Sequence, residues 1–284
     1  MLNRIEKFKK KLNRYGEKER ERILEAAYWA KELHSEQRRA SGEPYFIHPL
    51  QVAEILVDMQ LDCEAVIAAL LHDVVEDTVV SPVDLRRRFG RQISGLVDGV
   101  TKISIVKAKS KSEQESESIR KMLFAMTKDI RVIIIKLADK FHNMSTLEYL
   151  EPQKRKTIAN ECLDIYAPLA DRLGISWMKA ELEDLSLSHL QPETYEQIRS
   201  FLKSRKEERA SYLKKVERSI YNVAKEEGID IAVSTRAKHI YSIYQKMKKR
   251  GKDMKEIFDL LGIRILCENT TECYTILGLV HKLW

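Results

Sequence analysis

An apolar run, Ala65–Leu71, ends in four ionisable side chains within six positions. The run predicts a buried helix. At helical spacing His72 lies one turn from Glu76, and Asp73 lies one turn from Asp77. Because a carboxylate costs several kcal/mol to bury unless it is paired or bound to a metal ion, this segment is one of two things. It is either a solvated helix end with a hydrogen-bonded histidine, or part of a functional site.

Two other polar positions repeat this anomaly. His48 stands directly before Pro49, which suits the first turn of a helix. Asp139 lies within the apolar segment Val132–Met144, for which we predict a single buried helix, and Asn143 follows it by one turn. Three separate helices therefore supply polar groups that are costly to bury alone.

The candidate metal ligands are His48, His72, Asp73 and Asp139. Two imidazoles and two carboxylates suit a borderline divalent metal, and the sequence leaves Mn, Fe, Zn, Ni and Co open. Such a metal is a Lewis acid and lowers the pKa of bound water. Glu76 and Asp77 would then orient the attacking water or relay its protons. The pattern predicts metal-assisted hydrolysis of a phosphoester or phosphoanhydride.

The first two thirds of the chain is predicted to be helical. Two helices are expected over 4–36, one from Pro49 to about Met59, and one that ends at the His72 cluster. Further helices are expected over 82–90, 96–103, 119–126, 132–144 and 154–190, the last with a boundary at Pro168. Asp62 is the expected N-cap of the helix that precedes His72. The Lys/Ser/Glu-rich stretch 107–118 is expected to be a mobile loop, either a lid or a plain connection.

The last third changes character. Pro192 begins a long charged helix that runs to about Glu227 and would connect two domains. Apolar residues then alternate over 229–233, and the order strand, basic helix 238–249, strand 263–267 and helix to Trp284 is predicted. A sheet of two strands is marginal alone, so we expect the sequence to be part of a longer protein.

Charge and cysteine content limit the class of protein. The net charge is +7, and residues 199–255 carry 17 Lys or Arg against 7 Asp or Glu. This basic segment favours a polyanionic partner or forms a solvated helix face. The four cysteines have no metal-type C-x-x-C spacing, and no apolar run approaches membrane length. The charged residues that directly follow Met1 lead us to expect no signal peptide. We expect a reduced, cytoplasmic protein without membrane contact.

The order of the polar motifs resembles HD-type phosphohydrolases and, more closely, the catalytic half of long RelA/SpoT homologues, the bifunctional (p)ppGpp synthetase/hydrolases. The matching stretches are Arg39–Pro49, His72–Thr78, Phe89-Gly90, Leu96–Lys102, Arg120–Met122, Asp129–Val132, Lys136–Asp139, His142–Met144 and Tyr166–Gly174. They cover most of residues 20–190.

The resemblance implies a role for each hydrolase residue. His48, His72, Asp73 and Asp139 would bind Mn²⁺, and Glu76 and Asp77 would activate water on the 3′-pyrophosphate of ppGpp or pppGpp. The substrate contacts would be Arg39, Ser41, Asn143 and Thr146. The products would be GDP or GTP and pyrophosphate. Four positions differ from the family's usual residues. Ala40 stands where a basic residue is common, and Lys140, Phe141 and Ser145 stand where Arg, Leu and Arg are usual.

The tail resembles the start of the family's synthetase domain. The implied ATP-side residues are Arg236, Lys238, Ser242 and Lys246, and the implied Mg²⁺ ligand is Asp259. Thr235 and Ala237 differ from the usual Gly and Pro. The remaining synthetase strands would lie beyond Trp284, so we expect this sequence alone not to synthesise (p)ppGpp, although the full protein would. Contact with the ribosome is expected only through C-terminal regions outside this sequence.

These observations predict a mainly α protein in three parts. Residues 1–190 would be the all-helical HD-type hydrolase domain, 191–228 a helical connector, and 229–284 the incomplete start of an α+β nucleotidyltransferase-like synthetase domain. Two alternatives stay open at this point. One is a generic HD nucleotidase, dNTPase or cyclic-nucleotide phosphodiesterase, and the other is a regulatory module that binds the alarmone without turnover.

Overall fold

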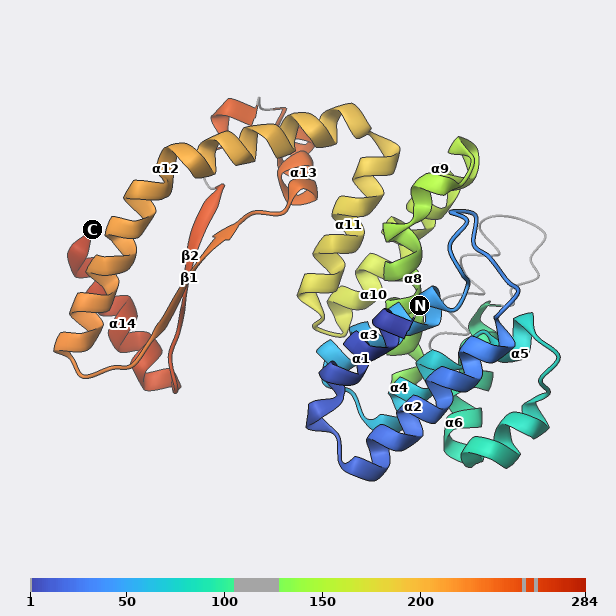
Figure 1. The fold of residues 1–284 in the computed structure, drawn as a ribbon. Helices are drawn as coiled ribbons and strands as arrows, with labels where there is room; N and C mark the ends of the chain where they lie inside the picture. Colours follow the sequence, from blue (N-terminus) through green and yellow to red (C-terminus); the bar gives the residue numbers. More distant parts are fainter. Residues whose placement is uncertain (1, 105–127, 252–253, 258–259) are drawn as a thin grey trace. The chain divides into compact units, whose positions relative to one another are not determined.

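The computed structural model describes residues 2–104, 128–251, 254–257 and 260–284. The chain is mainly helical, as predicted, and forms two compact units, residues 1–189 and 190–284 (Figure 1). The expected loop 107–118 and helix 119–126 lie outside the described residues. None of the described helices is both long and apolar enough to cross a membrane.

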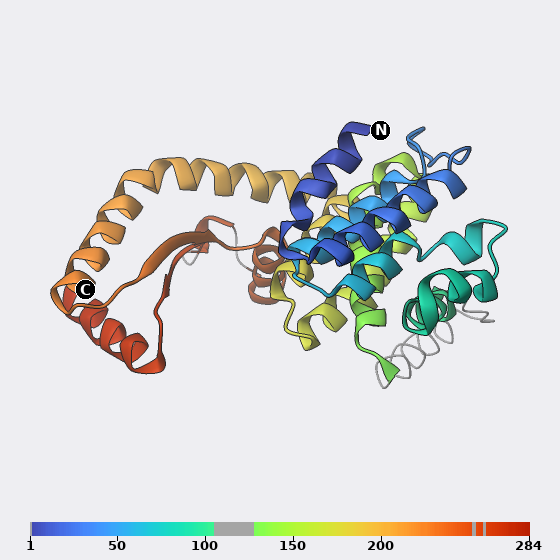
Figure 2. The ribbon, with the colours of Figure 1, turned by 60° about the horizontal axis from the view of Figure 1, so that its bottom comes forward.

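The first unit is built from helices. They are α1 (Leu2–Lys11), α2 (Glu17–Leu33), α3 (Ile47–Asp58), α4 (Cys63–Leu70), α5 (Val74–Asp77), α6 (Pro82–Ser104), α8 (Arg131–Ser145), α9 (Pro152–Glu161), α10 (Ala167–Arg172) and α11 (Ser176–Leu190). A π-helical turn, Cys162–Tyr166, joins α9 to α10. Figure 2 shows the same helices packed against one another from a second side.

Helix α4 is the centre of this unit. Seven of its eight residues are buried, and it contacts α2, α3, α6 and α8. Its N-terminus is capped as predicted, because the Asp62 carboxylate accepts a hydrogen bond of 2.8 Å from the Ala65 amide. An apolar helix that is covered on all sides places whatever follows its C-terminus inside the protein.

The helix that precedes His72 ends at the cluster, as predicted, but His72 and Asp73 lie in a turn and not on that helix. Helix α4 ends at Leu70, a turn covers residues 71–73, and the short helix α5 begins at Val74. The Leu71 amide still bonds to the Ile67 and Ala68 carbonyls, and the Asp77 amide to the Asp73 carbonyl. Adjacent side chains on a continuous helix point about 100° apart. Because α4 ends before the turn at residues 71–73, the side chains of His72 and Asp73 are not held to this angle.

A non-helical break within α6 falls at Gly90, where the sequence predicted a helix end. Gly90 has φ +87° and ψ 176°, so the helix is kinked there but resumes. Left-handed backbone of this kind is open to glycine at little cost. The second half of α6 packs against α8, the buried helix predicted over residues 132–144.

The second unit contains α12 (Pro192–Glu226), β1 (Ala232–Ala237), α13 (Ile240–Arg250), β2 (Leu261–Leu266) and α14 (Thr270–Leu283). Pro192 occupies the first turn of α12, as predicted. The two strands are antiparallel, with Ala232 opposite Leu266. Their order with the helices is the predicted one.

The first strand begins three residues later than its apolar alternation predicts. Gly228 has φ +70°, and the Ile229 amide bonds to the Ala224 carbonyl, so these residues cap α12. Ile231 is instead buried with Ile220, Ala224 of α12 and Ile276 of α14 in the unit's core.

Gly99 of α6 lies close against Val132 of α8. A Cβ atom placed there would lie 2.8 Å from a methyl carbon of Val132, which is buried. We expect Gly99→Ala to lower the free energy of unfolding by about 1–3 kcal/mol because the helices must move apart. Adding Val132→Ala should recover part of this loss. Denaturant unfolding of the single and double variants measures both effects.

Gly95→Ala is the matched control in the same helix. Apart from the local backbone of its own helix, no atom of the described residues lies within 4 Å of its added Cβ, so this change should stabilise the helix by up to about 1 kcal/mol. Equal destabilisation by the two alanine variants would contradict the close-approach explanation.

Candidate metal centre and nucleotide cleft

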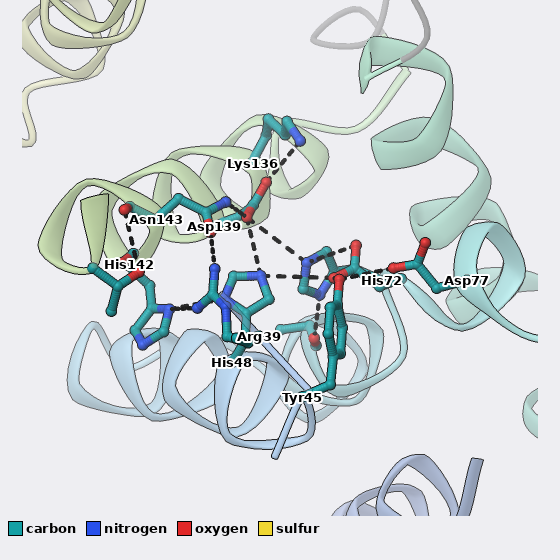
Figure 3. A network of polar contacts seen from close by, with 12 residues as sticks. Arg39, Tyr45, His48, His72, Asp77, Lys136, Asp139, His142 and Asn143 are labelled. Atoms are coloured by element: carbon teal, nitrogen blue, oxygen red, sulfur yellow. Dashed lines mark hydrogen bonds and ion pairs between the residues drawn. The ribbon is translucent and has the colours of Figure 1, made fainter. Parts of the chain in front are cut away.

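Three buried side chains from separate elements converge on one point (Figure 3). His48 comes from the first turn of α3, His72 from the turn after α4, and Asp139 from the middle of α8. They are 2%, 1% and 4% exposed, and one potential ligand atom from each lies within 4.8 Å of the others. The structure therefore brings together three of the four predicted metal ligands as a compact group.

The fourth predicted ligand, Asp73, stands at the edge of this group. Its Oδ1 atom lies 3.1 Å from His72 Nε2, and its Oδ2 atom lies 3.6 Å from His48 Nε2. The two oxygens thus face different imidazoles. The turn at residues 71–73 lets His72 and Asp73 face the same space.

The environment of His72 fits a cation. Its Nδ1 atom lies 2.7 Å from the Ala69 carbonyl oxygen, which can only accept, so Nδ1 carries the proton. Nε2 then presents a lone pair to the oxygens of Asp73 and Asp139, at 3.1 and 3.9 Å. Among the residues that the structure describes, this buried Nε2 has no hydrogen-bond partner. A lone pair that faces carboxylate oxygens is the arrangement that a divalent metal satisfies.

The charge of Asp139 is balanced inside the protein. Burial by itself raises the pKa of this carboxyl group, but the ammonium group of Lys136 holds its pKa well below the usual range. Lys136 Nζ donates to Asp139 Oδ2 at 2.7 Å, and Asn143 Nδ2 donates to Oδ1 at 2.6 Å. The carboxylate is thereby kept ionised and fixed in orientation.

The two predicted catalytic carboxylates lie beside the metal group. Burial raises the pKa of Glu76, and the nearby charge of Asp73 raises it further. The Tyr45 hydroxyl lies 2.7 Å from Asp77 Oδ2 and 2.8 Å from Asp73 Oδ2. Because a hydroxyl has one proton, it donates to one of these oxygens at a time.

A cleft of about 370 Å³ adjoins this group. All four predicted substrate residues line it. Its lining comprises Arg38, Arg39, Ala40, Ser41, Tyr45, Lys140, Asn143, Thr146, Leu147, Tyr149, Leu150 and Ile158. Cations, amide and hydroxyl groups, and an apolar wall therefore surround one space, which suits an anionic ligand with a planar ring.

The predicted synthetase residues lie in the second unit. Arg236 is on β1, Lys238 follows that strand and is half-buried, and Ser242 and Lys246 are on α13, exposed and half-buried respectively. The Lys238 amide donates to the Leu260 carbonyl at 2.9 Å. Asp259 lies outside the described residues.

The sequence predicted no role for Tyr45, Lys136 or His142, although all three stand next to the site. Lys136 precedes Asp139 by three residues within an apolar run, and this spacing is a signal for a buried ion pair. The position of His142 against His48 and Arg39 depends on two other segments, so local spacing carries no signal for it.

The family model of the HD domain matches residues 26–176. The chain belongs to the HD domain family. A second model, described as the region found in RelA / SpoT proteins, matches residues 235–284. The two matches coincide with the two parts for which the sequence motifs predicted a RelA/SpoT resemblance, and this resemblance is confirmed.

Curated relatives cover nearly the whole chain. One from Borreliella burgdorferi, named guanosine-3′,5′-bis(diphosphate) 3′-pyrophosphohydrolase, is 48% identical over 100% of this chain and 43% of its own length. A GTP pyrophosphokinase from Myxococcus xanthus is 46% identical over 92% of this chain and 35% of its own. The bifunctional (p)ppGpp synthase/hydrolase SpoT of Escherichia coli is 44% identical over 93% of this chain and 38% of its own length. The chain thus spans less than half of each of these relatives.

Metal binding should stabilise the first unit. We expect Mn²⁺ at a hundred times its Kd to contribute about 2.7 kcal/mol and so to raise the Tm of chelator-treated protein. In Asp139→Asn and His72→Gln this rise should be lost, because each change removes a ligand atom from the group. Differential scanning calorimetry with and without metal is the measurement.

Asp171→Asn is the control for loss of a carboxylate. Asp171 is exposed and pairs with Lys179 on the surface, so its variant should keep the full rise in Tm. A metal-dependent rise that persists in both ligand variants would contradict the assignment of this group.

Proposed function

We propose that this chain hydrolyses the 3′-pyrophosphate of ppGpp and pppGpp to GDP or GTP and pyrophosphate. The observation that carries the proposal is the junction of a metal-ligating group with a basic, partly apolar cleft, in an HD domain. The names of the relatives in Borreliella burgdorferi and Escherichia coli support the substrate.

Mn²⁺ is the proposed cofactor, held by His48, His72, Asp73 and Asp139. A bound divalent metal supplies Lewis acidity and makes a nearby water molecule more acidic. The structure supports neutral imidazoles at the site, because burial lowers the pKa of His48. A neutral imidazole is the form that can bind a metal.

The chain's own residues handle the substrate and the protons. Arg39, Ser41, Asn143 and Thr146 are proposed to bind the guanosine part in the cleft. Glu76 takes a proton from the attacking water, and Asp77 orients that water with the help of Tyr45. The water oxygen bonds to the 3′-phosphorus, the bond between phosphorus and O3′ breaks, and O3′ leaves with a proton as the ribose hydroxyl.

The whole protein is proposed to have a second activity, the transfer of pyrophosphate from ATP to GDP or GTP with Mg²⁺. The match of residues 235–284 to the RelA / SpoT region and the name of the Myxococcus xanthus relative support it. Arg236, Lys238, Ser242, Lys246 and Asp259 are the proposed contributors from this chain. The division into hydrolase domain 1–190, connector 191–228 and synthetase part 229–284 is proposed on the same basis.

Partners and location follow from the proposed chemistry. The ligands are ppGpp or pppGpp and the product nucleotides, which are soluble, and the cytoplasm is therefore the proposed location. Contact with the ribosome is proposed only for regions of the whole protein outside this sequence.

The hydrolase is tested by incubating the protein with ppGpp, with and without Mn²⁺, and measuring GDP and pyrophosphate. Release should require both the metal and Asp73, and Asp73→Ala should therefore be inactive. A panel with dNTPs and cyclic nucleotides separates this function from a generic HD nucleotidase. Tight ppGpp binding without turnover by metal-loaded protein would favour a regulatory module and overturn the proposal.

Glu76 should separate catalysis from metal binding. We expect Glu76→Gln to lower kcat for ppGpp by about 10²–10⁴-fold, because the amide cannot take a proton from water. Its Kd for Mn²⁺ should stay within a few-fold of the unaltered protein. Steady-state kinetics and calorimetric titration give the two values.

Glu181→Gln is the matched control, since Glu181 is exposed on α11 and distant in sequence from every site motif. It should leave both kcat and metal affinity unchanged. If Glu76→Gln instead lost Mn²⁺ binding to the same degree as turnover, Glu76 would belong to the metal ligands.

A further inference from the structure

His142 contacts both the metal-ligating group and the cleft. Its Nδ1 atom lies 2.8 Å from His48 Nδ1 and 3.1 Å from Arg39 Nη1. The rings of His48 and His142 are 4.9 Å apart (Figure 3). The motif matches contain His142, but neither the metal assignment nor the substrate assignment uses it.

The proton positions at this contact follow from the chemistry of arginine. A guanidinium group only donates hydrogen bonds, so the His142 Nδ1 atom must present a lone pair to Arg39. The single lone pair of this Nδ1 is then shared between Arg39 and His48, and His48 Nδ1 must carry the proton of their contact.

The tautomer of His48 decides whether it can bind a metal. With the proton on Nδ1, its Nε2 lone pair points to Asp139 Oδ1 at 3.2 Å and Asp73 Oδ2 at 3.6 Å. With the proton on Nε2, the ligand atom would be blocked. His72 reaches the same tautomer through the Ala69 carbonyl. Both histidines thus direct a lone pair toward Asp139.

We propose that His142 is a positioning residue that fixes the metal-binding tautomer of His48, and that Arg39 holds His142 in the accepting state. This inference rests on the proposed function of the metal site. The proposal adds a chain of contacts, from Arg39 through His142 to His48, that links the cleft to the metal-ligating group.

A second branch of contacts runs from the same arginine. Arg39 Nη2 donates to Asn143 Oδ1 at 2.5 Å, and Asn143 Nδ2 donates to Asp139 Oδ1 at 2.6 Å. Arg39 therefore orients His48 through His142 and Asp139 through Asn143. Since Arg39 also lines the cleft, occupation of the cleft and of the metal site are energetically coupled, and the coupling is reciprocal.

Three variants of the full chain test the positioning role. His142→Leu removes the acceptor, and we expect the Kd for Mn²⁺, measured by calorimetry without nucleotide, to rise about 10–100-fold. His142→Asn places an amide oxygen where Nδ1 stood, and should restore the Kd to within about threefold. His189→Leu removes a half-buried histidine elsewhere in the first unit and should leave the Kd unchanged.

The imidazole ¹⁵N spectrum gives a readout that a merely structural role would not move. In the metal-free, unaltered protein, His48 should carry its proton on Nδ1, and His142 should not. In His142→Leu the His48 signals should shift toward the other tautomer. A proton on His142 Nδ1 in the unaltered protein would overturn the proposal, even if the leucine variant failed to fold.

Arg39→Met tests the link to the cleft. It should raise the Kd for Mn²⁺ in the absence of nucleotide, by less than His142→Leu does, and this loss should largely vanish in the His142→Leu background. Equal Kd values for the unaltered protein, His142→Leu and Arg39→Met would overturn the inference. These readouts need no turnover, so absence of ppGpp hydrolysis with normal tautomers would count against the proposed function alone.

Discussion

The buried carboxylate of Asp139 is the constraint on which the site depends. A charge in the middle of an apolar helix is stable only when its surroundings supply compensating groups. Lys136 supplies a positive charge from the preceding turn, and Asn143 supplies a hydrogen bond from the following turn. The Nε2 atoms of His48 and His72 face the same carboxylate, and the His72 lone pair among these oxygens creates the need for a cation.

The fold forms this buried site around Asp139 because helix α4 lies in the interior of the first unit. Because α4 is covered by α2, α3, α6 and α8, the turn after it delivers His72 and Asp73 to the interior. The break at residues 71–73 matters as much as the helix, since it lets neighbouring side chains face one space. The close approach of α6 and α8 at Gly99 fixes the helix that carries Asp139.

Metal site and cleft are parts of one hydrogen-bonded system. Arg39 reaches His142 and Asn143, and these reach one metal ligand each. A fixed network of this kind places ligand atoms before the ion binds, which lowers the reorganisation needed at the site. It also gives a ligand in the cleft a physical route by which it can act on the metal group.

The sequence by itself determined the mainly helical fold class, the buried helix 132–144, the Asp62 cap and the four ligand candidates, because local periodicity and the cost of buried charge act over short distances. Only the tertiary structure decided the turn at 71–73, the late start of β1 and the contacts of His142 with His48 and Arg39. Those features depend on contacts between segments far apart in the chain, such as Arg39 with His142, and no local pattern records them.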